Sequence, residues 1–466
     1  MADCFATRTD AKTIPITPLT HNEVNKWIKK QQASVAAWVT DSGFDAKPGA
    51  VLSIPTQLLA KPTTKNAIGM VLVGTTGPDD IWSWGAIGDK LPAGRYTIVG
   101  QPGVKEATRL SIGWGLGAYR FGRYKDVAEP ATKLVIPSNA DKGAVDRTVS
   151  SINLTRDLIN TPASDMGPAE LADSARALAK EFKATFKVTV GDKLLKDNFP
   201  SIHAVGRASV REPRLIDFKW GRASDPKITL VGKGVCFDTG GLDLKGASGM
   251  LTMKKDMGGA ANVLGLARMI MMAGLRVRLR VLIPAVENSV SGNAYRPLDV
   301  IKTRKGITIE VGNTDAEGRI VLSDALALAA SEKPKMILDF ATLTGAARVA
   351  LGTGLPAMFA NNDALANAFL KCGEAEDDPV WRMPLFQPYR SLLDSKVADM
   401  NNVGSVPQGG AITAALFLES FVEDDTPWAH FDIMAWNRSA QPGKPEGGEA
   451  MAIRAAFEVI ARQTKK

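Results

Sequence analysis

The sequence predicts an α/β protein of two domains, a smaller N-terminal α/β domain and a larger C-terminal domain with a mixed, doubly wound sheet. Three observations predict this class. Apolar β-type runs alternate with helical stretches over most of the chain, a long helical pattern occupies residues 141–160, and 466 residues exceed what a single core normally serves.

Residues 1–140 predict a separate α/β domain. Short β-type runs at 69–73 and 95–99 are divided by Gly-Pro and Pro-Gly turns, and residues 23–39 place apolar side chains at helical spacing. No cluster of Asp, Glu, His or Cys accompanies these elements. We therefore interpret residues 1–140 as an accessory domain.

Residues 141–160 predict a connecting helix. Val145, Val149, Ile152 and Leu158 recur at helical spacing, and the pattern stops at Asn160-Thr-Pro, where proline cannot continue a helix. Because this helix lies at a change of composition, we place the domain boundary there. Residues 161–466 then form the second domain.

The second domain alternates strands and helices. Strands are predicted at 228–237, 277–285, 335–340 and 428–433, an extended segment at 307–311, and helices at 257–273, 319–330 and 411–421. Strands separated by helices indicate a doubly wound sheet. Ligands of such sheets bind beyond the carboxyl ends of the strands, so the residues that follow each strand are the candidates for function.

Composition excludes several classes of protein. The chain has 57 Lys and Arg against 49 Asp and Glu, a formal net charge of +8, but its basic residues are scattered. Three cysteines without a C-x-x-C pair do not form a disulfide framework, and three distant histidines exclude a histidine-based zinc motif. We find no signal peptide and no apolar run of membrane-spanning length, so we expect a cytoplasmic protein with no membrane association.

Acids and lysines gather where the predicted strands end. Asp238 follows the strand that contains Lys233, and Lys245 comes shortly afterwards. Asp256 opens the next helix, and Asp315 and Glu317 precede another. An Asp-x-Glu pair alone also fits helix capping, and the spacing of a phosphate-binding P-loop is absent. Taken together, however, the carboxylates repel one another unless one or two cations lie among them, and oxygen donors favour Mg²⁺, Mn²⁺ or a hard Zn²⁺ site.

Three segments carry a resemblance to a known family. Residues 313–319 (NTDAEGR) resemble the signature heptapeptide of the leucyl (cytosol) aminopeptidase family. Residues 231–241 (VGKGVCFDTGG), followed by Lys245 and by 253–257 (MKKDM), resemble its other metal-binding stretch, and 339–346 (DFATLTGA) resemble its third motif. The similarity runs from Asn160 to the end of the chain.

The resemblance implies a two-metal aminopeptidase that releases N-terminal amino acids, leucine-like or broader, from peptides. It implies two divalent ions, Mn²⁺ or Zn²⁺, a bicarbonate ion near Arg319, and a homohexamer. The implied ligands of one metal are Lys233, Asp238, Asp256 and Glu317, and those of the other are Asp238, Asp315 and Glu317. Lys245 and Arg319 would be catalytic. Substrate would be bound by Met253, Asn313, Thr342, Leu343, Ala346 and the segment 434–437.

Two departures from the family pattern carry expectations of their own. The family commonly has Lys-Pro-Ser where this chain has Lys245-Gly246-Ala247, so we expect a more mobile lysine loop. Met434 and Asn437 stand where the family usually has small or apolar residues, so we expect a more selective or more polar pocket for the first side chain.

Two other functions compete with the aminopeptidase. A DNA-binding regulatory role has the net charge of +8 as its support, without a basic run or a helix-turn-helix pattern. A non-catalytic hexameric scaffold is the other alternative, but every motif acid and both lysines are present. The aminopeptidase is therefore the preferred hypothesis.

Overall fold

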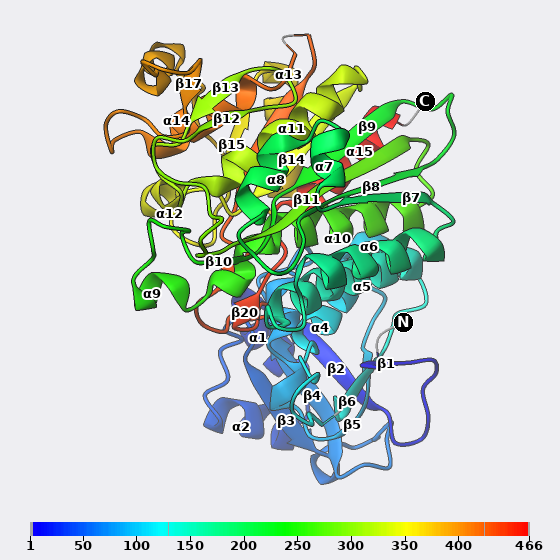
Figure 1. Cartoon of the computed structure of the whole chain (residues 1–466). Coiled ribbons are helices and arrows are strands. Elements are labelled where there is room, and N and C mark those ends of the chain that lie inside the picture. Colours follow the sequence, from blue (N-terminus) through cyan, green and yellow to red (C-terminus); the bar gives the residue numbers. More distant parts are fainter. Residues whose placement is uncertain (1–2, 129, 424, 465–466) are drawn as a thin grey trace. The chain divides into compact units, whose positions relative to one another are not determined.

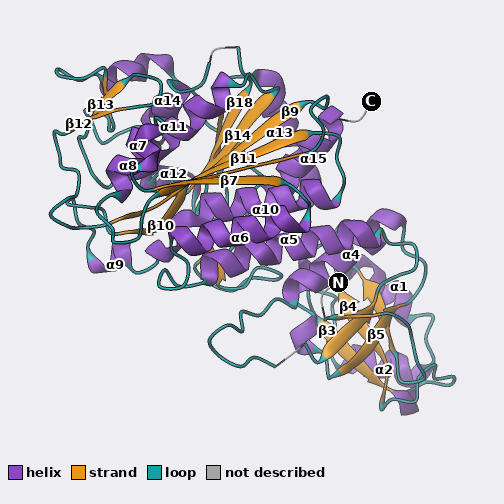
Figure 2. Cartoon of the chain, turned by 45° about the vertical axis from the view of Figure 1, so that its right-hand side comes forward, coloured by secondary structure: helices purple, strands orange, loops and turns teal. Residues whose placement is uncertain are grey.

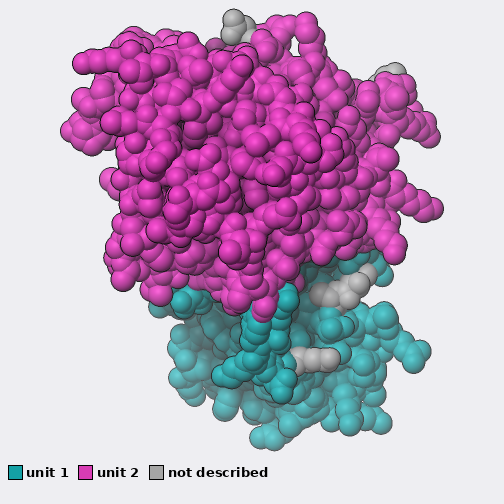
Figure 3. Space-filling model, viewed as in Figure 1, with its two compact units in different colours: residues 1–153, 438–446 teal, residues 154–437, 447–466 magenta. Residues whose placement is uncertain are grey.

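The computed structural model describes residues 3–128, 130–423 and 425–464, which form two compact units (Figure 1, Figure 3). Unit 1 comprises residues 1–153 and 438–446, and unit 2 comprises residues 154–437 and 447–466. α5 (Lys142–Asn160) is one continuous helix that crosses this division. The sequence analysis assigned residues 438–446 to the second domain, whereas the structure groups them with unit 1.

Unit 1 contains a six-stranded sheet in the order β1-β6-β5-β2-β4-β3. The strands are β1 (Phe5–Ala6), β6 (Thr132–Val135), β5 (Gly94–Ile98), β2 (Ile14–Leu19), β4 (Ile68–Gly74) and β3 (Val51–Pro55). β3 pairs antiparallel with β4, and the other pairs are parallel. The two runs predicted at 69–73 and 95–99 correspond to β4 and β5.

Side-chain alternation along β4 gives the unit 1 sheet a core on each face. Val71 and Val73 join a cluster with residues of α3 (Trp82–Gly85) and α4 (Val104–Gly117), whereas Leu72 joins a second cluster with residues of α1 (Val24–Ile28) and α2 (Ala33–Asp41). Successive residues of a strand point to opposite faces, so one strand serves both layers.

The single helix predicted over residues 23–39 is wrong, because the structure contains two short helices there. α1 ends at Ile28, and Gln32, the residue before α2, has extended backbone angles of φ −65° and ψ 155°. The break lets Trp27 and Ile28 of one helix and Val35 and Val39 of the other pack against the same cluster. Packing on the curved sheet therefore overrides the continuous helical spacing.

Residues 438–446 pack closely within unit 1. A Cβ on Gly85 of α3 would lie 2.5 Å from the Cα of Gly443, so only glycine allows this approach. The ammonium of Lys444 lies 4.3 Å from the centre of the Trp82 ring. Gly443 is thus buried against α3, while most of the segment around it lies on the surface of unit 1.

Unit 2 contains a nine-stranded mixed sheet in the order β16-β15-β18-β14-β9-β11-β8-β7, with β10 also paired to β11. The strands are β16 (Trp381–Arg382), β15 (Ala357–Ala360), β18 (Trp428–Asp432), β14 (Met336–Ala341), β9 (Lys227–Gly232), β11 (Arg278–Asn288), β8 (Arg214–Trp220), β7 (Thr185–Val190) and β10 (Gly234–Asp238). β18, β14, β9, β11 and β10 run parallel, so their carboxyl ends meet along one edge.

Helices cover both faces of this sheet, as the doubly wound prediction requires (Figure 2). One face holds α6 (Pro168–Glu181) and α10 (Gly258–Met272), with α15 (Ile453–Thr464) against α10 and α13 (Asp363–Ala375) against α15. The other face holds α7 (Lys193–Lys196), α8 (Pro200–Gly206), α11 (Glu317–Ser331) and α14 (Gly410–Glu419). The class and the mixed sheet are confirmed.

The strand predicted at 228–237 is divided in the structure. Lys233 separates β9 from β10: β11 pairs with both strands, whereas the pairing with β14 ends at Gly232. A register irregularity between Val235 and Phe237 follows, around the buried Cys236. Bulges bend a strand and change the direction of the side chains beyond them. Here the strand beyond the irregularity consists of Phe237 and Asp238.

Smaller elements complete unit 2. β12 (Val300–Lys302), β13 (Thr308–Glu310) and β17 (Met400–Asn401) form a three-stranded sheet, and β19 (Trp436–Asn437) pairs with β20 (Gly447–Gly448). α9 (Ala247–Met250), a 3₁₀ helix at Met253–Met257 and α12 (Gly345–Leu351) lie in loops after strands. Within the described ranges, no helix has both the length and the apolar character needed to cross a bilayer.

Candidate active site

Four segments bring the predicted acids and lysines together at the carboxyl edge of the parallel strands of unit 2. Lys233 follows β9 and Asp238 ends β10, while Asp256 lies in the 3₁₀ helix that precedes α10. Asp315 lies in the loop before α11, and Glu317 is the first residue of that helix. This is the position at which doubly wound sheets bind ligands.

Three carboxylates form a group close enough to share a cation. One oxygen of each of Asp238, Asp315 and Glu317 lies within 4.8 Å of the others. Asp238 and Glu317 are buried, and Asp315 is half-buried. The mutual repulsion expected from the sequence is therefore present in the structure.

Lys233 is the buried centre of a second group of contacts. Its Nζ lies 2.7 Å from Oδ2 of Asp256 and 2.8 Å from Oε1 of Glu317, and it donates a hydrogen bond of 3.0 Å to the carbonyl of Thr342. The Thr342 hydroxyl in turn donates to Oδ1 of Asp256 at 2.7 Å. Burial acts to lower the pKa of Lys233, but Asp256, Glu317 and Asp238 outweigh it and the net shift is upward.

The space for Lys233 depends on a glycine of the signature heptapeptide. A Cβ on Gly318 would lie 2.7 Å from Cε and 2.8 Å from Nζ of Lys233. The first turn of α11 can therefore approach the lysine only without a side chain at this position. This explains in physical terms why Glu317 is followed by glycine.

Lys245 bridges the acids from the other side. Its Nζ lies 2.9 Å from Oδ2 of Asp238 and also contacts Oδ1 of Asp315. Burial acts to lower the pKa of Lys245, but the charge of Asp238 and the hydrogen bond to Asp315 raise it by more. The net shift is upward, so the lysine is protonated. It is a fixed positive charge beside the carboxylates.

The acids retain an excess of negative charge that suits divalent cations. Burial, reinforced by Asp256, raises the pKa of Asp238 to about 6, and burial with the charge of Asp238 raises the pKa of Glu317 to about 8. Four carboxylates face the two ammonium groups of Lys233 and Lys245. A cluster of carboxylate oxygens without His or Cys matches the preferences of hard divalent ions, so these residues fit the expected metals.

Arg319 lies beside this cluster and is buried. Its Nη1 donates to the carbonyl of Asn402 at 2.7 Å, and its Nε has no hydrogen-bond partner among the described residues. Burial lowers the pKa of Arg319 to about 10. Asn402 also donates to the carbonyl of Asn313 at 2.7 Å, and the Asn313 side chain accepts from the amide of Asp315 at 2.7 Å. Arg319 and Asn313 are thus tied to the acidic loop.

The remaining predicted substrate-binding residues occupy four places. Met253 is buried in the 3₁₀ helix that carries Asp256, and Leu343 follows Thr342 at the end of β14. Ala346 lies in α12 and packs against the apolar cluster that includes Ala347 and Ala411. The segment 434–437 lies near Thr342, since a Cβ on Gly258 would meet Ala435 at 2.4 Å and Thr342 at 3.2 Å.

Sequence reasoning missed several polar residues that hold this site. Asn288 stands opposite Asp238 in the parallel register of β10 and β11 and donates to its Oδ1 at 2.8 Å. Asp432 accepts hydrogen bonds from the amides of Leu343 and Thr344 and from the Thr344 hydroxyl. Both residues end apolar strands, and this signal was available in the sequence. Asn402, by contrast, follows the two-residue strand β17 and has no comparable signal.

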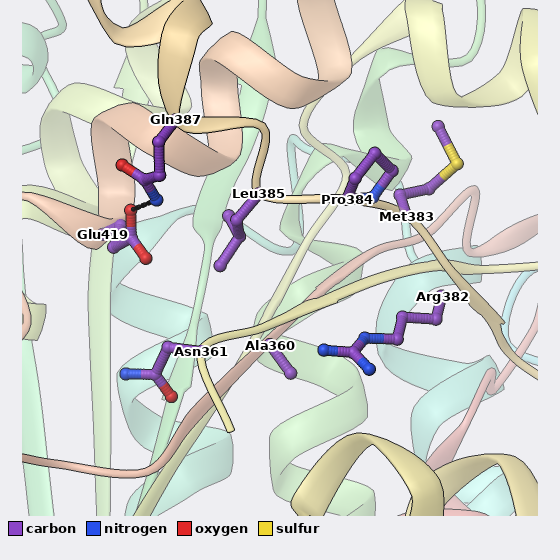
Figure 4. A pocket seen from close by; sticks show the side chains of 8 residues that line it. All are labelled: Ala360, Asn361, Arg382, Met383, Pro384, Leu385, Gln387 and Glu419. Atoms are coloured by element: carbon purple, nitrogen blue, oxygen red, sulfur yellow. Dashed lines mark hydrogen bonds between the residues drawn. The ribbon is translucent and has the colours of Figure 1, made fainter. Parts of the chain in front are cut away.

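A separate pocket of about 520 Å³ lies at the end of β15, away from these acids (Figure 4). Its polar groups are bonded within the chain: Asn361 binds the backbone of Thr426 and Trp428, and Glu419 accepts from Gln387 at 2.9 Å. We therefore place the chemistry at the carboxylate cluster.

Comparison with known proteins identifies the family of this chain. The family model for the cytosol aminopeptidase catalytic domain matches residues 153–457, and the model for the M17 aminopeptidase N-terminal domain matches residues 14–137. The chain is therefore a hydrolase of the metalloaminopeptidase class, a peptidase that releases N-terminal residues. It belongs to the cytosol aminopeptidase family, and the N-terminal match extends the sequence resemblance to unit 1.

Individual relatives support the same assignment. A probable cytosol aminopeptidase of Roseiflexus castenholzii is 43% identical over 380 residues, covering 77% of each chain. One from Caulobacter vibrioides is 36% identical over 459 residues, covering 92% of this chain and 91% of the relative. The cytosol aminopeptidase structure from Coxiella burnetii has a TM-score of 0.95 at 50% identity over the whole of both chains. The bottromycin maturation enzyme BotP in complex with Mn has a TM-score of 0.86 at 32% identity, covering 98% and 100%.

Proposed function

We propose that this chain is a two-metal aminopeptidase that removes leucine-like, or more broadly varied, residues from the free N-termini of peptides. The observation that carries the proposal is the close approach of Asp238, Asp315 and Glu317, whose oxygens lie within 4.8 Å of one another at the sheet edge. Lys233 and Asp256 extend this group on one side, and Lys245 extends it on the other.

The residues divide into two overlapping sets of ligands. One divalent ion, Mn²⁺ or Zn²⁺, would be held by Lys233, Asp238, Asp256 and Glu317, and the other by Asp238, Asp315 and Glu317. Lys233 binds a cation only through a neutral amine, so its Nζ proton must leave when the ion enters. When bound at this place, two such ions would supply a more acidic water and polarisation of the scissile carbonyl. Support for manganese comes from the structure of BotP in complex with Mn.

The chain's own charged groups serve the transition state. Lys245 is held beside Asp238 and Asp315, where its ammonium can donate a hydrogen bond to the oxyanion that develops on the scissile carbonyl. Arg319 offers a buried guanidinium whose Nε has no partner among the described residues, and we propose that it holds a bicarbonate ion. That ion would take the proton of the attacking water, which agrees with a site built without histidine.

Substrate orientation falls to the end of β14 and its neighbours. We propose that the carbonyl of Leu343 accepts a hydrogen bond from a backbone amide of the substrate. Met253, Asn313, Thr342 and Ala346 line the pocket for the first side chain. Met434 and Asn437 lie in the neighbouring segment 434–437. They would make the pocket more selective or more polar than is usual in the family.

We also propose a homohexamer that acts in the cytoplasm, where the relatives named cytosol aminopeptidases are placed by their names. The large apolar content after residue 411 would suit a buried interface, but Ala411, Leu416 and Phe417 of α14 are buried within the subunit core and do not support one. Light scattering tests the assembly directly, and a monomer mass would contradict it.

The test of the function is release of p-nitroaniline from leucine p-nitroanilide with Mn²⁺, after chelation, and after return of metal. Activity should disappear with the metal and return with it. A peptide with an acetylated N-terminus should resist cleavage, because the free α-amine is expected to bind a cation. Metal-independent turnover, or efficient cleavage of the blocked peptide, would contradict the proposal.

A further inference from the structure

The loop that carries Lys245 is held firmly on one side only. On the upstream side, the amide of Lys245 donates to the carbonyl of Thr239 at 2.9 Å. On the downstream side, a Cβ on Gly246 would meet nothing within 4 Å, and Leu251 beyond α9 is 82% exposed. The carbonyl of Gly246 accepts from the amides of Gly249 and Met250, so its partners lie in the next turn of the same loop. The contacts that tie the backbone around Lys245 to other parts of the chain therefore lie before it.

Asp243 and Thr314 make a reciprocal set of hydrogen bonds across two loops. The amide of Asp243 donates to Oγ1 of Thr314 at 2.8 Å, and the amide of Thr314 donates to Oδ2 of Asp243 at 2.7 Å. The Thr314 hydroxyl donates to the carbonyl of Gly240 at 2.6 Å. These three bonds join residues that are 71 or more positions apart in the chain.

Thr314 is a rigid anchor for this contact. It is completely buried, and its carbonyl accepts from Nδ2 of Asn288 at 3.0 Å and from the hydroxyl of Tyr295 at 2.6 Å. Asn288 also donates to Asp238. Asp243, in contrast, is exposed. A surface carboxylate is thus bonded to a threonine that the core fixes in place.

The partners of this contact adjoin the reactive groups. Thr314 immediately precedes Asp315, and Asp243 lies two residues before Lys245, whose Nζ is 2.9 Å from Asp238. We propose that Asp243 is a positioning residue for Lys245. Its reciprocal hydrogen bonds with Thr314, called the clasp below, hold the lysine loop (residues 239–247) against the acidic loop (residues 313–317). This inference rests on the proposed function, which assigns Lys245 to the oxyanion.

The physical reason for such a clasp is the precision that a charged donor requires. A donor displaced by about 1 Å from a developing charge can lose about a hundredfold in rate. The sequence predicted a mobile loop from Lys245-Gly246-Ala247. The hydrogen bonds between Asp243 and Thr314 restrict the motion of this loop, which Gly246 does not do.

The test compares Asp243→Ala with a chemically matched control. Asp399 makes the same reciprocal contact with Thr308: Oδ2 accepts from the Thr308 amide at 2.8 Å and hydroxyl at 2.7 Å, and its own amide donates back at 3.0 Å. That contact joins β13 to β17 instead of the lysine loop. Asp399→Ala removes the same bonds from an exposed aspartate elsewhere.

We expect Asp243→Ala to lower kcat for leucine p-nitroanilide about tenfold to a hundredfold while KM and Tm change little, because binding and packing are left intact. Asp399→Ala should keep kcat within about twofold. Thr314→Ser retains the hydroxyl, so its kcat should stay near that of the parent. The double variant of Asp243→Ala with Thr314→Val should be no slower than the slower single variant, since both remove one contact.

Hydrogen–deuterium exchange supplies a readout that does not depend on turnover. The peptide covering residues 239–250 should exchange faster in Asp243→Ala than in the parent, and Asp399→Ala should leave it unchanged. If the parent shows no metal-dependent aminopeptidase activity, the proposed function fails whatever the variants do. If the parent is active and Asp243→Ala retains both kcat and slow exchange, the clasp alone is refuted.

Discussion

The two units use the same architecture but end their strands differently. Each contains five parallel strands covered by helices on both faces. In unit 1 the last residue of each parallel strand and the residue after it are uncharged: Ala6 and Thr7, Leu19 and Thr20, Gly74 and Thr75, Ile98 and Val99, Val135 and Ile136. In unit 2 the same positions include Lys233, Asp238, Asn288, Thr342 and Asp432. The fold decides where chemistry can occur, and the strand-terminal residues decide whether it does.

The largest effect should come from removing one of these terminal charges. Glu317→Gln keeps the shape of the side chain but removes a ligand proposed to be shared by both ions, so we expect at least about a thousandfold loss of activity. Bound metal, measured by elemental analysis, should fall with it. Thr20→Ala, at a strand end of unit 1, should retain full activity. Metal content and turnover unchanged in Glu317→Gln would break the comparison.

Crowding the lysine should have the next largest effect. Gly318→Ala places a Cβ 2.7 Å from Cε of Lys233, and the displaced ammonium can no longer satisfy both Asp256 and Glu317. We expect a loss of activity of about tenfold to a hundredfold, as for changes that disturb metal ligands indirectly. Gly354→Ala is the control, because its Cβ meets nothing within 4 Å. Equal activity of the two variants would contradict this packing argument.

A smaller effect is expected at the end of β18. In Asp432→Asn, an NH₂ group replaces one of the two carboxylate oxygens that accept from Leu343 and Thr344. This buried NH₂ group would then face the backbone amide or hydroxyl that donated to the lost oxygen. We expect a loss of about 1–3 kcal/mol in the free energy of unfolding, seen as a lower Tm. KM should also rise, because Leu343 would no longer be held for substrate. A variant with unchanged Tm and KM would show that this loop does not need Asp432.

The smallest effect is expected at Asp324, a buried acid outside the carboxylate cluster, and it concerns the pH dependence of stability. Asp324, on α11, accepts from the amides of Ser201 at 2.9 Å and Arg304 at 2.7 Å, yet burial raises its pKa to about 6. The folded state therefore binds the proton more tightly than the unfolded chain, whose Asp pKa is about 3.9. Stability from this group is present below about pH 4 and is lost as the pH rises to about 6.

Denaturant unfolding of the parent and of Asp324→Asn at several pH values tests this sign. The stability difference between parent and variant should decline from about pH 4 to about pH 6, by at most about 3 kcal/mol, and stay constant above. A difference that grows with pH would mean that the hydrogen bonds outweigh burial.

The sequence predicts the parts of this molecule that local patterns determine. The motif segments 231–241, 253–257 and 313–319 have characteristic residues at fixed spacing, so their acids and lysines could be named before the structure was known. The alternation of strands and helices was sufficient for the class of fold. The roles of these residues nevertheless follow from the family resemblance, and the variants above are what test them.

Long-range pairing explains what the sequence could not predict. The interruption at Lys233 lies where the pairing with β14 ends while β11 continues alongside β10, and neither partner can be inferred from residues 228–237. The break between α1 and α2 depends on the shape of the sheet below them. Asn402 acts through partners distant in the chain, and no local spacing marks it.

The return of residues 438–446 to unit 1 affects how the protein is made. Because Gly443 and Lys444 pack against Gly85 and Trp82, α3 lacks these contacts until the ribosome has passed residue 444. A fragment that stops at residue 153 would expose the surface of α3 that Gly443 and Lys444 cover. The N-terminal unit is therefore not a module that gene fusion or truncation can separate cleanly from the rest of the chain.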